Sequence, residues 1–493
     1  MPTTNPVSEV GLKLGTETIV RAGPVLGRVP PLRGAAAWAS KQYFRAIKNK
    51  DHAESYSPGM QEDLFQIRLV FVHALERLLA QPVAPAARRA LVRNLLYGSL
   101  LEQGYRDVVD RFQAQYGTRP PGLLVISPGK ACNLHCSGCY ADSGTTSEKL
   151  DWTIFNSIIM QAKALWGVRF FVITGGEPLA YRSLGKGVLE AAEKHPDCYF
   201  LMYTNGTLIG KEVTERLASI GNITPAISVE GWRERTDARR GAGVFDQALA
   251  AMARLRSAGV PFGLSLTATR DNAEEILSDE FVNYFFEQQG ALYGWLFHYM
   301  PIGRSPTLDL MPTPEQRMWM WRRSWELIRE RHLFIGDFWN HGTLSQGCIA
   351  AGRSNGGGYL HIDWNGAVTP CVFVPYSPVN IHEVFARGGT INDAWAHPFL
   401  ASIREWQAAY RQSGGNWLAP CPIRDHHADF RQLLDKHQPQ PTDANARAAL
   451  LDPDYAAGLA AYDAAYQALS EDVWQSVYDG GKARSIQGQA GQG

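Results

Sequence analysis

Three cysteines on one short segment carry the most specific chemistry in this chain. Cys132, Cys136 and Cys139 lie within residues 131–140 (ACNLHCSGCY), with the spacing Cx3Cx2C. Thiolates at this spacing can bind three corners of a cubane iron–sulfur cluster and leave the fourth iron open to a substrate or cofactor. A zinc site with His135 as fourth ligand, or buried apolar cysteines, are the alternatives. Because the chain has only 7 cysteines in 493 residues, the spacing is improbable by chance.

A second motif makes the chain similar to a known family. Residues 175–178 read Gly-Gly-Glu-Pro and follow the apolar run 169–174, and Tyr140 is an aromatic residue directly after the last cysteine. Gly-Gly and Glu-Pro alone are ordinary turn residues. Together with the Cx3Cx2C segment they resemble the radical S-adenosylmethionine (SAM) enzymes, in which such a segment ends the second strand and holds the amino group of SAM. The resemblance covers residues 120–305 well and extends loosely to about 430, but it does not reach the first hundred residues.

The composition predicts a folded protein of two or three domains, because 493 residues exceed one typical core. The chain is 45% apolar, and its 48 Lys and Arg balance 48 Asp and Glu, which argues against a general nucleic-acid binder. Seven cysteines clustered as ligands do not suggest a disulfide framework and favour a reducing compartment, the cytoplasm. We expect neither a signal peptide nor a transmembrane segment, since no apolar stretch approaches about 18 residues.

Short apolar runs alternate with helical patterns through the middle of the chain. Six such repeats predict a parallel α/β sheet with right-handed crossovers, and ligands of such sheets gather at the carboxyl ends of the strands. The cysteine segment follows the first run, Gly-Gly-Glu-Pro the second and Asn205-Gly206 the third. The resemblance adds the partial (β/α)6 barrel of the family. The expected strands are 123–127, 169–174, 199–204, 224–229, 262–267 and 294–299, and the expected helices are 152–165, 211–220, 246–258 and 273–288.

Further segments are expected to flank this barrel. The N-terminal arm is rich in Gly, Pro and basic residues, and it fits either contact with a membrane surface or partner, or a wrap around the domain, which we favour. Pro24, Pro30 and Pro31 would break a long amphipathic helix. Helices are expected from Gln61 to about Gln115, including 86–101 and 103–116. The expected domains are a loose arm at 1–57, a helical domain at 58–119, the radical SAM core at 120–315, an auxiliary-cluster region at 316–435 and a helical tail at 436–493.

The resemblance also implies which residues bind SAM. After the fourth run, the segment 227–240 is similar to the family segment in which a serine or acid meets the ribose and an arginine meets the SAM carboxylate, although Glu230 stands where many relatives have Asp. Arginine suits a carboxylate because its planar fork donates two parallel hydrogen bonds. The choice between its two arginines stays open, and a solvated charged loop is the alternative. The implied cofactor-binding residues are Gly175, Gly176, Glu177, Pro178, Asn205, Ser228, Glu230, Arg239, Arg240 and Thr267.

Three C-terminal cysteines predict a second, auxiliary cluster. Cys348 and Cys371 flank an expected β-hairpin that turns at Asn365-Gly366. The ending G-x4-C resembles the start of the auxiliary-cluster region called SPASM, or of its shorter relative, twitch. Cys421 would supply the third thiolate from a distant segment. Buried thiols or a zinc site are the alternatives, and the remaining Cys198 is expected to be a core residue in a strand.

The C-terminal region also departs from the full SPASM pattern. Residues 372–420 contain no cysteine, whereas SPASM carries a dense run of them there. At most one auxiliary cluster therefore fits. Its fourth ligand would be Asp425, His426 or His427, or its fourth iron would be open.

The resemblance implies an enzyme with a [4Fe–4S] cluster and SAM as cofactors. A reduced cluster would pass one electron to SAM and cleave it to methionine and a 5′-deoxyadenosyl radical, which would take a hydrogen atom from a substrate C–H bond. An auxiliary cluster would remove the second electron or bind the substrate. A low-potential donor such as flavodoxin or ferredoxin is the expected redox partner. No residue that acts on the substrate is predicted.

The sequence is compatible with two classes of substrate. A peptide or protein is favoured and a lipid or other apolar metabolite comes second, although no leader-binding winged helix is visible in the first 120 residues. An electron carrier with two clusters would not need the Gly-Gly-Glu-Pro motif or six repeats. A zinc-bound structural or interaction protein is a second alternative, and a brown colour with iron and sulfide in anaerobically purified protein would exclude it. An aromatic stretch after the barrel either lines an apolar pocket or forms ordinary core; it comprises Trp295, Phe297, Trp319, Trp321, Trp325, Phe338 and Trp339.

Overall fold

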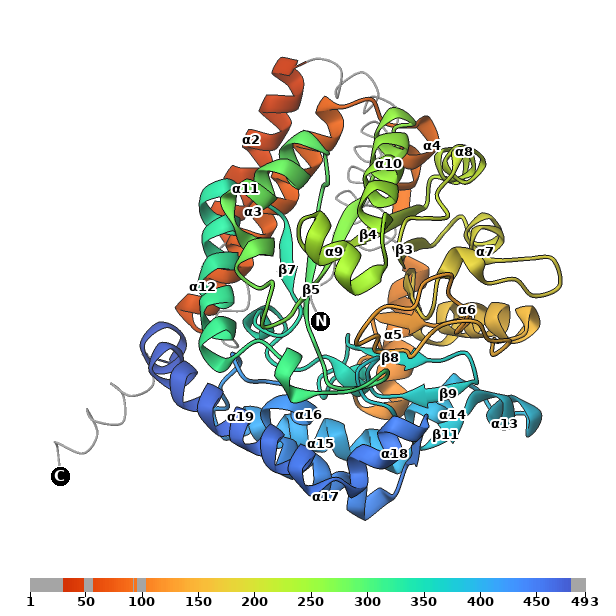
Figure 1. The fold of residues 1–493 in the computed structure, drawn as a ribbon, viewed down its shortest axis with the longest axis vertical. Coiled ribbons are helices and arrows are strands. Elements are labelled where there is room, and N and C mark those ends of the chain that lie inside the picture. Colours follow the sequence, from red (N-terminus) through yellow and green to blue (C-terminus); the bar gives the residue numbers. More distant parts are fainter. Residues whose placement is uncertain (1–29, 48–55, 92, 95–102, 480–493) are drawn as a thin grey trace.

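The fold of the described residues centres on a twisted ten-stranded sheet wrapped by helices (Figure 1). Two short antiparallel strands, β10 (Tyr376–Ser377) and β12 (Gln440–Pro441), form a separate sheet. The computed structural model describes residues 30–47, 56–91, 93–94 and 103–479. Most of the expected N-terminal arm, the end of the expected helix 86–101 and residues 480–493 lie outside the described residues. The expected domain boundaries stay predictions.

Six parallel strands form the centre of the sheet in chain order, as the apolar runs predicted. Every expected run matches its strand to within one residue, because a strand buried on both faces reads as a continuous apolar run. The strands are β1 (Leu123–Ile126), β2 (Phe170–Ile173), β3 (Tyr199–Thr204), β4 (Ile223–Val229), β5 (Gly263–Ala268) and β6 (Gly294–His298).

The crossover helices cover the outer face of these strands (Figure 1). They include α6 (Trp152–Trp166), α7 (Val188–Lys194), α8 (Lys211–Ile220), α9 (Arg233–Arg240) and α10 (Val244–Ser257).

The prediction of a single helix over 273–288 was wrong. Three short helices occupy that segment: η3 (Glu275–Leu277), α11 (Asp279–Val282) and η4 (Asn283–Gln288). The break falls at Ser278, whose backbone is extended and whose hydroxyl accepts a hydrogen bond from the Phe281 N–H. Serine is a favoured N-cap residue, so it starts a new helix here.

The expected C-terminal hairpin is present, and it belongs to the same sheet as the barrel. Strands β8 (Tyr359–Ile362) and β9 (Ala367–Thr369) are antiparallel, and β8 also pairs in parallel with β1, with His361 opposite Val125. The short strand β11 (Val379–Asn380) continues this edge, and β7 (Ile335–Asp337) extends the other edge beside β6. The pairing of β8 with β1 joins segments more than two hundred residues apart, and no local sequence signal indicates it.

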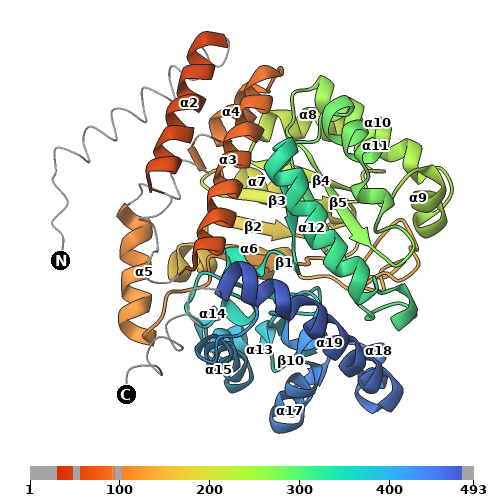
Figure 2. The same cartoon turned by 90° about the vertical axis from the view of Figure 1, so that its left-hand side faces the viewer.

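Helices enclose both sides of the barrel (Figures 1 and 2). Where a loose arm was expected, the chain forms α2 from Pro30 to Ile47; prolines start this helix because the first helical N–H groups have no intrahelical partner. The N-terminal layer continues with α3 (Pro58–Ala80), α4 (Pro85–Ala90) and α5 (Gln103–Tyr116). The later helices are α12 (Pro314–Arg331), α13 (Ile381–Ala386), α14 (Ile391–Trp395), α15 (Pro398–Gln412), α16 (Pro422–Asp425), α17 (His427–His437), α18 (Ala444–Leu451) and α19 (Pro453–Val473).

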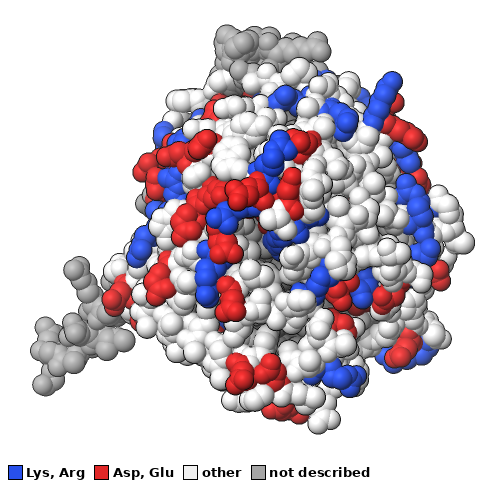
Figure 3. Space-filling view, viewed as in Figure 1, with Lys and Arg blue, Asp and Glu red and all other residues white. Residues whose placement is uncertain are grey.

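The surface gives little indication of a partner. Lys, Arg, Asp and Glu are interspersed on the face shown in Figure 3. Of the helices within the described ranges, none has both the length and the apolar character that crossing a membrane requires.

A second apolar core ties the N-terminal helix α3 to α12 and α19, and it encloses one carboxyl group. Asp63 is fully buried, and its carboxylate accepts hydrogen bonds from Thr343 Oγ1 (2.8 Å), Tyr478 OH (2.7 Å) and Arg329 Nη2 (2.9 Å). Burial raises the pKa of Asp63 from 3.8 to about 6, although these three donors act in the opposite direction.

We predict that Asp63→Asn changes the pH dependence of stability. Between about pH 4 and pH 6 the folded protein keeps a proton at Asp63 that the unfolded chain has lost, so the wild type loses stability as the pH rises through this window. Relative to the variant, this loss is on the order of 1–3 kcal/mol. Denaturant unfolding of both proteins at pH 4.5 and 6.5 measures it, and a difference that does not depend on pH would contradict the prediction.

Candidate active site

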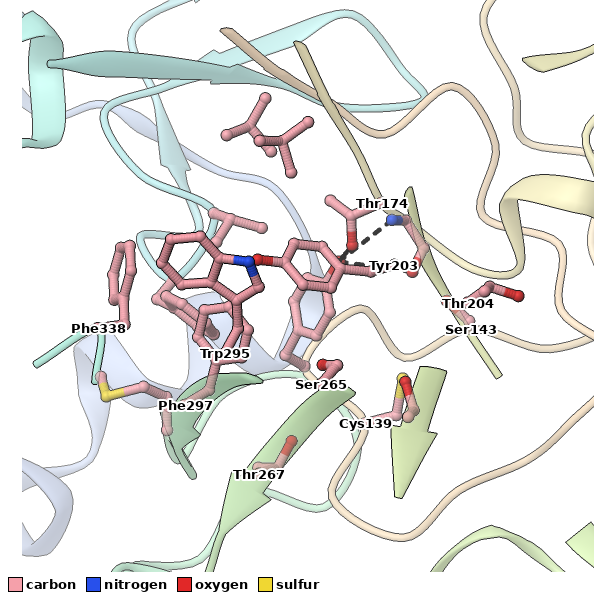
Figure 4. Close-up of a pocket in the computed structure, with 18 of the residues that line it drawn as sticks. Cys139, Ser143, Thr174, Tyr203, Thr204, Ser265, Thr267, Trp295, Phe297 and Phe338 are labelled. Carbon is pink, nitrogen blue, oxygen red and sulfur yellow. Dashed lines mark hydrogen bonds between the residues drawn. The ribbon is translucent and has the colours of Figure 1, made fainter. Parts of the chain in front are cut away.

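A cavity of about 280 Å³ opens at the carboxyl ends of the central strands. Alternate residues of the strands line it, because successive side chains of a strand point to opposite faces. The pairs Leu123 and Val125 of β1 and Trp295 and Phe297 of β6 show this spacing. In Figure 4, Trp295, Phe297 and Phe338 gather at one end of the cavity, while Cys139 lies at the other. The lining is mostly apolar, so the few polar groups in it are candidates for binding and chemistry.

The three cysteines of the Cx3Cx2C segment all line this cavity. Hydrogen bonds from a distant part of the chain fix their loop: Arg304 donates through Nη1 to the Cys136 carbonyl (2.8 Å) and through its backbone N–H to the Cys139 carbonyl (2.9 Å). The Cys132 N–H donates to the Gly144 carbonyl (2.9 Å). The loop is therefore held in a defined shape by the protein alone.

The loop supplies three free thiols, which is the donor set that a cubane cluster binds at three of its corners. Burial raises the pKa of Cys132 to about 11, and burial also raises that of Cys136 although Arg240 acts against it. The free thiols would therefore be protonated, and binding of iron would release their protons. Among the residues that the structure describes, no three His, Cys, Asp or Glu side chains converge as a single ion requires.

Gly175 and Gly176 pack against the backbone of the cysteine loop. The Gly176 N–H donates to the Gly129 carbonyl and the Glu177 N–H to the Ala131 carbonyl, both at 2.9 Å. A Cβ on Gly175, whose φ is +114°, would lie 2.6 Å from the Gly129 oxygen. These glycines were expected to let a ligand approach the backbone; they line the cavity, and they also let the cysteine loop approach β2.

Glu177 has an internal partner for each carboxylate oxygen. It accepts hydrogen bonds from Thr204 Oγ1 (2.8 Å), from the Asn205 N–H (2.9 Å) and from the Leu179 N–H (3.1 Å). It is buried, and neither Glu177 nor Pro178 lines the cavity. The carboxylate thus ties the end of β3 to the turn after β2.

Glu230 is also buried and pairs with both candidate arginines. Its carboxylate accepts from Arg239 Nη1 (2.7 Å) and from Arg240 Nε (2.9 Å). Arg239 additionally donates to the Ser137 carbonyl (3.2 Å) in the cysteine loop, whereas the described hydrogen bonds of the Arg240 side chain all go to Glu230. The predicted residues that do line the cavity are Gly175, Gly176, Asn205, Ser228, Arg239, Arg240 and Thr267.

The three C-terminal cysteines come from separate segments, and each interacts electrostatically with at least one of the other two. Burial raises the pKa of Cys348 and of Cys371 to about 12, and smaller contributions come from Cys371 on Cys348 and from Cys421 on Cys371. Tyr359 OH lies 2.8 Å from Cys371 Sγ. Tyr359 and the neighbours of these cysteines, Ile349 and Val372, line the same cavity as the Cx3Cx2C loop.

The three candidates for a fourth auxiliary ligand differ in what they already bind. Asp425 is fully buried, forms an ion pair with Arg317 and accepts from the Cys421 N–H (3.0 Å). His426 Nε2 lies 2.9 Å from the Ala419 carbonyl oxygen. His427 Nε2 is buried without a hydrogen-bond partner in the described part of the chain. Of the three, His427 alone therefore has a buried side-chain nitrogen without a hydrogen-bond partner in the described residues.

The aromatic stretch is divided between cavity and core. Trp295, Phe297 and Phe338 line the cavity, whereas Trp321 and Trp325 belong to the second core. The other two, Trp319 and Trp339, pack in or against the main core. The sequence did not single out Tyr299 or Phe373 as lining residues, and only their place near strand ends or after a candidate ligand could have indicated them. Cys198 is fully buried, directly before β3.

Comparison with known proteins agrees with the fold and the predicted family. The model of the radical SAM superfamily matches residues 126–279. Mycofactocin maturase MftC of Mycolicibacterium smegmatis is 30% identical over 311 residues, which are 60% of this chain and 76% of the relative. The AdoMet-dependent heme synthase of Methanosarcina barkeri is 26% identical over 294 residues, 54% of this chain and 81% of the relative. The crystal structure of Streptococcus suis SuiB bound to precursor peptide SuiA aligns with a TM-score of 0.50 at 19% identity, covering 61% of this chain and 70% of SuiB.

The fold and the cysteine loop define a SAM-dependent radical enzyme with a [4Fe–4S] cluster. The chain belongs to the radical SAM superfamily. This membership confirms the predicted class, cofactors and barrel, and it excludes the alternative of a non-catalytic electron carrier.

We predict that Gly175→Ala damages the cluster site. The new Cβ meets the Gly129 carbonyl and is strained at φ +114°, so the cysteine loop must move, at a cost of about 1–3 kcal/mol. Iron bound per chain after anaerobic reconstitution should fall. Gly34→Ala is the control, because a Cβ there meets nothing within 4 Å in helix α2. Equal iron content in both variants would contradict the prediction.

Proposed function

We propose that this enzyme oxidatively modifies a C–H bond of a peptide or protein. The observation that carries the proposal is the single cavity that joins the Cx3Cx2C loop to the neighbours of Cys348 and Cys371. A substrate in this cavity would lie between the site where SAM is cleaved and a second cysteine site. When bound, the cluster and SAM supply a 5′-deoxyadenosyl radical that takes a hydrogen atom from the substrate.

The chain's own residues would bind and orient SAM. Cys132, Cys136 and Cys139 would each bind one iron, and the main chain at Gly175 and Gly176 would face the methionine moiety. Ser228 and Thr267 offer hydroxyl groups to the ribose, and Asn205 stands beside Cys132, with its Nδ2 3.9 Å from the sulfur. Apolar side chains around them would exclude water, so that the radical meets only the substrate.

Arg239 and Arg240 would have different roles in the site. Arg240 would bind the SAM carboxylate, because it lines the cavity and its described partners are limited to Glu230. Arg239 would hold the cysteine loop through the Ser137 carbonyl. Glu230 would orient both guanidinium groups rather than contact the ribose.

We predict that the two arginine variants fail differently. Arg240→Ala should weaken SAM binding by about tenfold or more, because a charge-assisted contact is worth roughly 1.5–3 kcal/mol, and it should retain iron. Arg239→Ala should mainly lower the iron retained after reconstitution. Anaerobic titration calorimetry with SAM and iron analysis measure the two effects; the reverse pattern would exchange the roles.

A peptide substrate is supported by the relatives and by the size of the cavity. MftC is named a maturase, and SuiB was crystallised with a precursor peptide. A cavity of about 280 Å³ is at the lower end of ligand sites and must also receive SAM, which favours entry of one side chain of a longer substrate. The runner-up is an apolar metabolite, supported by the aromatic lining and by the matched heme synthase.

The auxiliary cluster would be bound by Cys348, Cys371 and Cys421. Its role would be to accept the second electron, so that loss of one hydrogen atom and one electron from the substrate gives a net oxidation. A low-potential flavodoxin or ferredoxin would supply the electron for SAM cleavage. These reduced thiols suit the cytoplasm.

We predict that Cys132→Ala and Cys371→Ala separate the two cysteine sites. The first should abolish 5′-deoxyadenosine formation with dithionite, because the cluster would lose one of its three protein ligands. The second should keep SAM cleavage and lose product, because the substrate radical has no electron acceptor. Mass spectrometry of reactions with peptides encoded beside the gene, and with lipid extracts in parallel, tests the substrate class. Product from lipids alone would overturn the peptide assignment, and wild-type product yield in Cys371→Ala would overturn the auxiliary role.

A further inference from the structure

A series of hydrogen-bonded, buried polar side chains runs between the end of β1 and the Cys371 carbonyl. Ser127 follows β1, His361 lies in the adjacent β8, and Thr369 lies opposite it in β9. Ser127 Oγ is 2.8 Å from His361 Nε2, and His361 Nδ1 is 2.9 Å from Thr369 Oγ1. The Thr369 hydroxyl donates to the Cys371 carbonyl at 3.0 Å. All three side chains are buried, so each hydrogen bond is shielded from water.

The other end of this series lies beside the Cx3Cx2C loop. The Tyr140 hydroxyl, one residue after Cys139, bonds to Thr174 Oγ1 (2.7 Å) and accepts from the Gly175 N–H (3.2 Å). Ser127 itself packs against Gly175, because a Cβ on that glycine would lie 3.2 Å from Ser127 Cβ. The hydrogen-bonded series therefore runs from a residue that lies beside the loop, at the end of β1, to the Cys371 carbonyl.

The Cys371 carbonyl fixes which atom donates in each hydrogen bond from Ser127 through His361 to Thr369. A carbonyl can only accept, so the Thr369 hydroxyl must donate to it and must accept from His361 Nδ1–H. His361 Nε2 then accepts from the Ser127 hydroxyl. This needs a neutral imidazole with one donor and one acceptor, and burial lowers the pKa of His361 to about 3.

We propose that His361 is a positioning residue that, through Ser127 and Thr369, fixes Cys371 relative to the Cx3Cx2C loop. The proposal rests on the proposed role of Cys371 as an auxiliary-cluster ligand. Residues that hydrogen-bond to a metal ligand orient that ligand and tune the metal. Their loss typically lowers metal affinity or activity about tenfold or more. Cluster potentials respond to the same hydrogen bonds. A role in hairpin stability alone would not change a potential.

Two variants each remove one hydrogen bond of this series with little change in side-chain shape, and a matched control variant leaves the series intact. Thr369→Val removes the central hydroxyl, and Ser127→Ala removes the hydroxyl that donates to His361. Thr224→Val is the control, because Thr224 is also buried in the sheet and its hydroxyl also donates to a carbonyl, that of Pro261 (3.0 Å), with Tyr293 OH at 2.8 Å. Thr369→Ser keeps the hydroxyl and should restore the wild-type behaviour.

The first measurement is made on metal-free protein under anaerobic conditions. The alkylation rate of each cysteine is followed by peptide mass spectrometry, with fully buried Cys198 as internal reference. Thr369→Val and Ser127→Ala should raise the rate at Cys371 by roughly three- to tenfold, which corresponds to the loss of one buried hydrogen bond. Thr224→Val should not.

The second measurement isolates the auxiliary cluster. In protein carrying Cys132→Ala, Cys136→Ala and Cys139→Ala, the midpoint potential and the EPR spectrum of the reconstituted cluster should shift with Thr369→Val and Ser127→Ala and return with Thr369→Ser. An unchanged potential in both variants, or the same shift in Thr224→Val, overturns the positioning role. If the protein with these three substitutions binds no iron, Cys371 is not a ligand and the proposed auxiliary cluster is wrong. The alkylation rates then still decide whether His361 and its partners position Cys371.

Discussion

The pairing of β8 with β1 is the contact on which the arrangement of this active site depends. Strand β1 leads directly into the Cx3Cx2C loop, and β8 leads into the hairpin that ends at Cys371. Backbone hydrogen bonds continue the pairing beyond the strand ends, from the Ser127 N–H to the Ile362 carbonyl (2.9 Å) and from the Gly122 N–H to the Gly358 carbonyl (2.8 Å). The Cx3Cx2C loop and the neighbours of Cys348 and Cys371, which are far apart in sequence, thus line one cavity.

Charge and burial explain why the site must be held so firmly. Burial raises the pKa values of Cys132 and Cys136 in the loop and of Cys348, Cys371 and Cys421, so the folded protein alone does not stabilise these groups as thiolates. Buried Glu177 and Glu230 are fully hydrogen-bonded, and each joins a strand end to a neighbouring loop or helix. The loop is thereby preorganised before any cofactor arrives, which reduces the cost of ordering it upon binding.

The barrel and the cysteine loop could be predicted from the sequence because their signals are local. Apolar runs give the six strands, and ligand spacing gives the loop. The role of Gly175 in loop packing, the shared carboxylate of Glu230 and the place of β8 beside β1 could not be predicted, because each depends on contacts between distant segments. The aromatic stretch shows the same limit: composition does not say whether Trp295 or Trp321 faces a cavity or a core.

The central claim is that three thiols hold a cluster whose remaining iron is open to SAM. Mössbauer spectroscopy of protein reconstituted with ⁵⁷Fe, in a variant with Cys348, Cys371 and Cys421 replaced by alanine, tests it most directly. Addition of SAM should change the parameters of a single iron site and leave the others as they were. A spectrum that SAM does not alter would mean that this iron is already bound by the protein, and it would contradict the account.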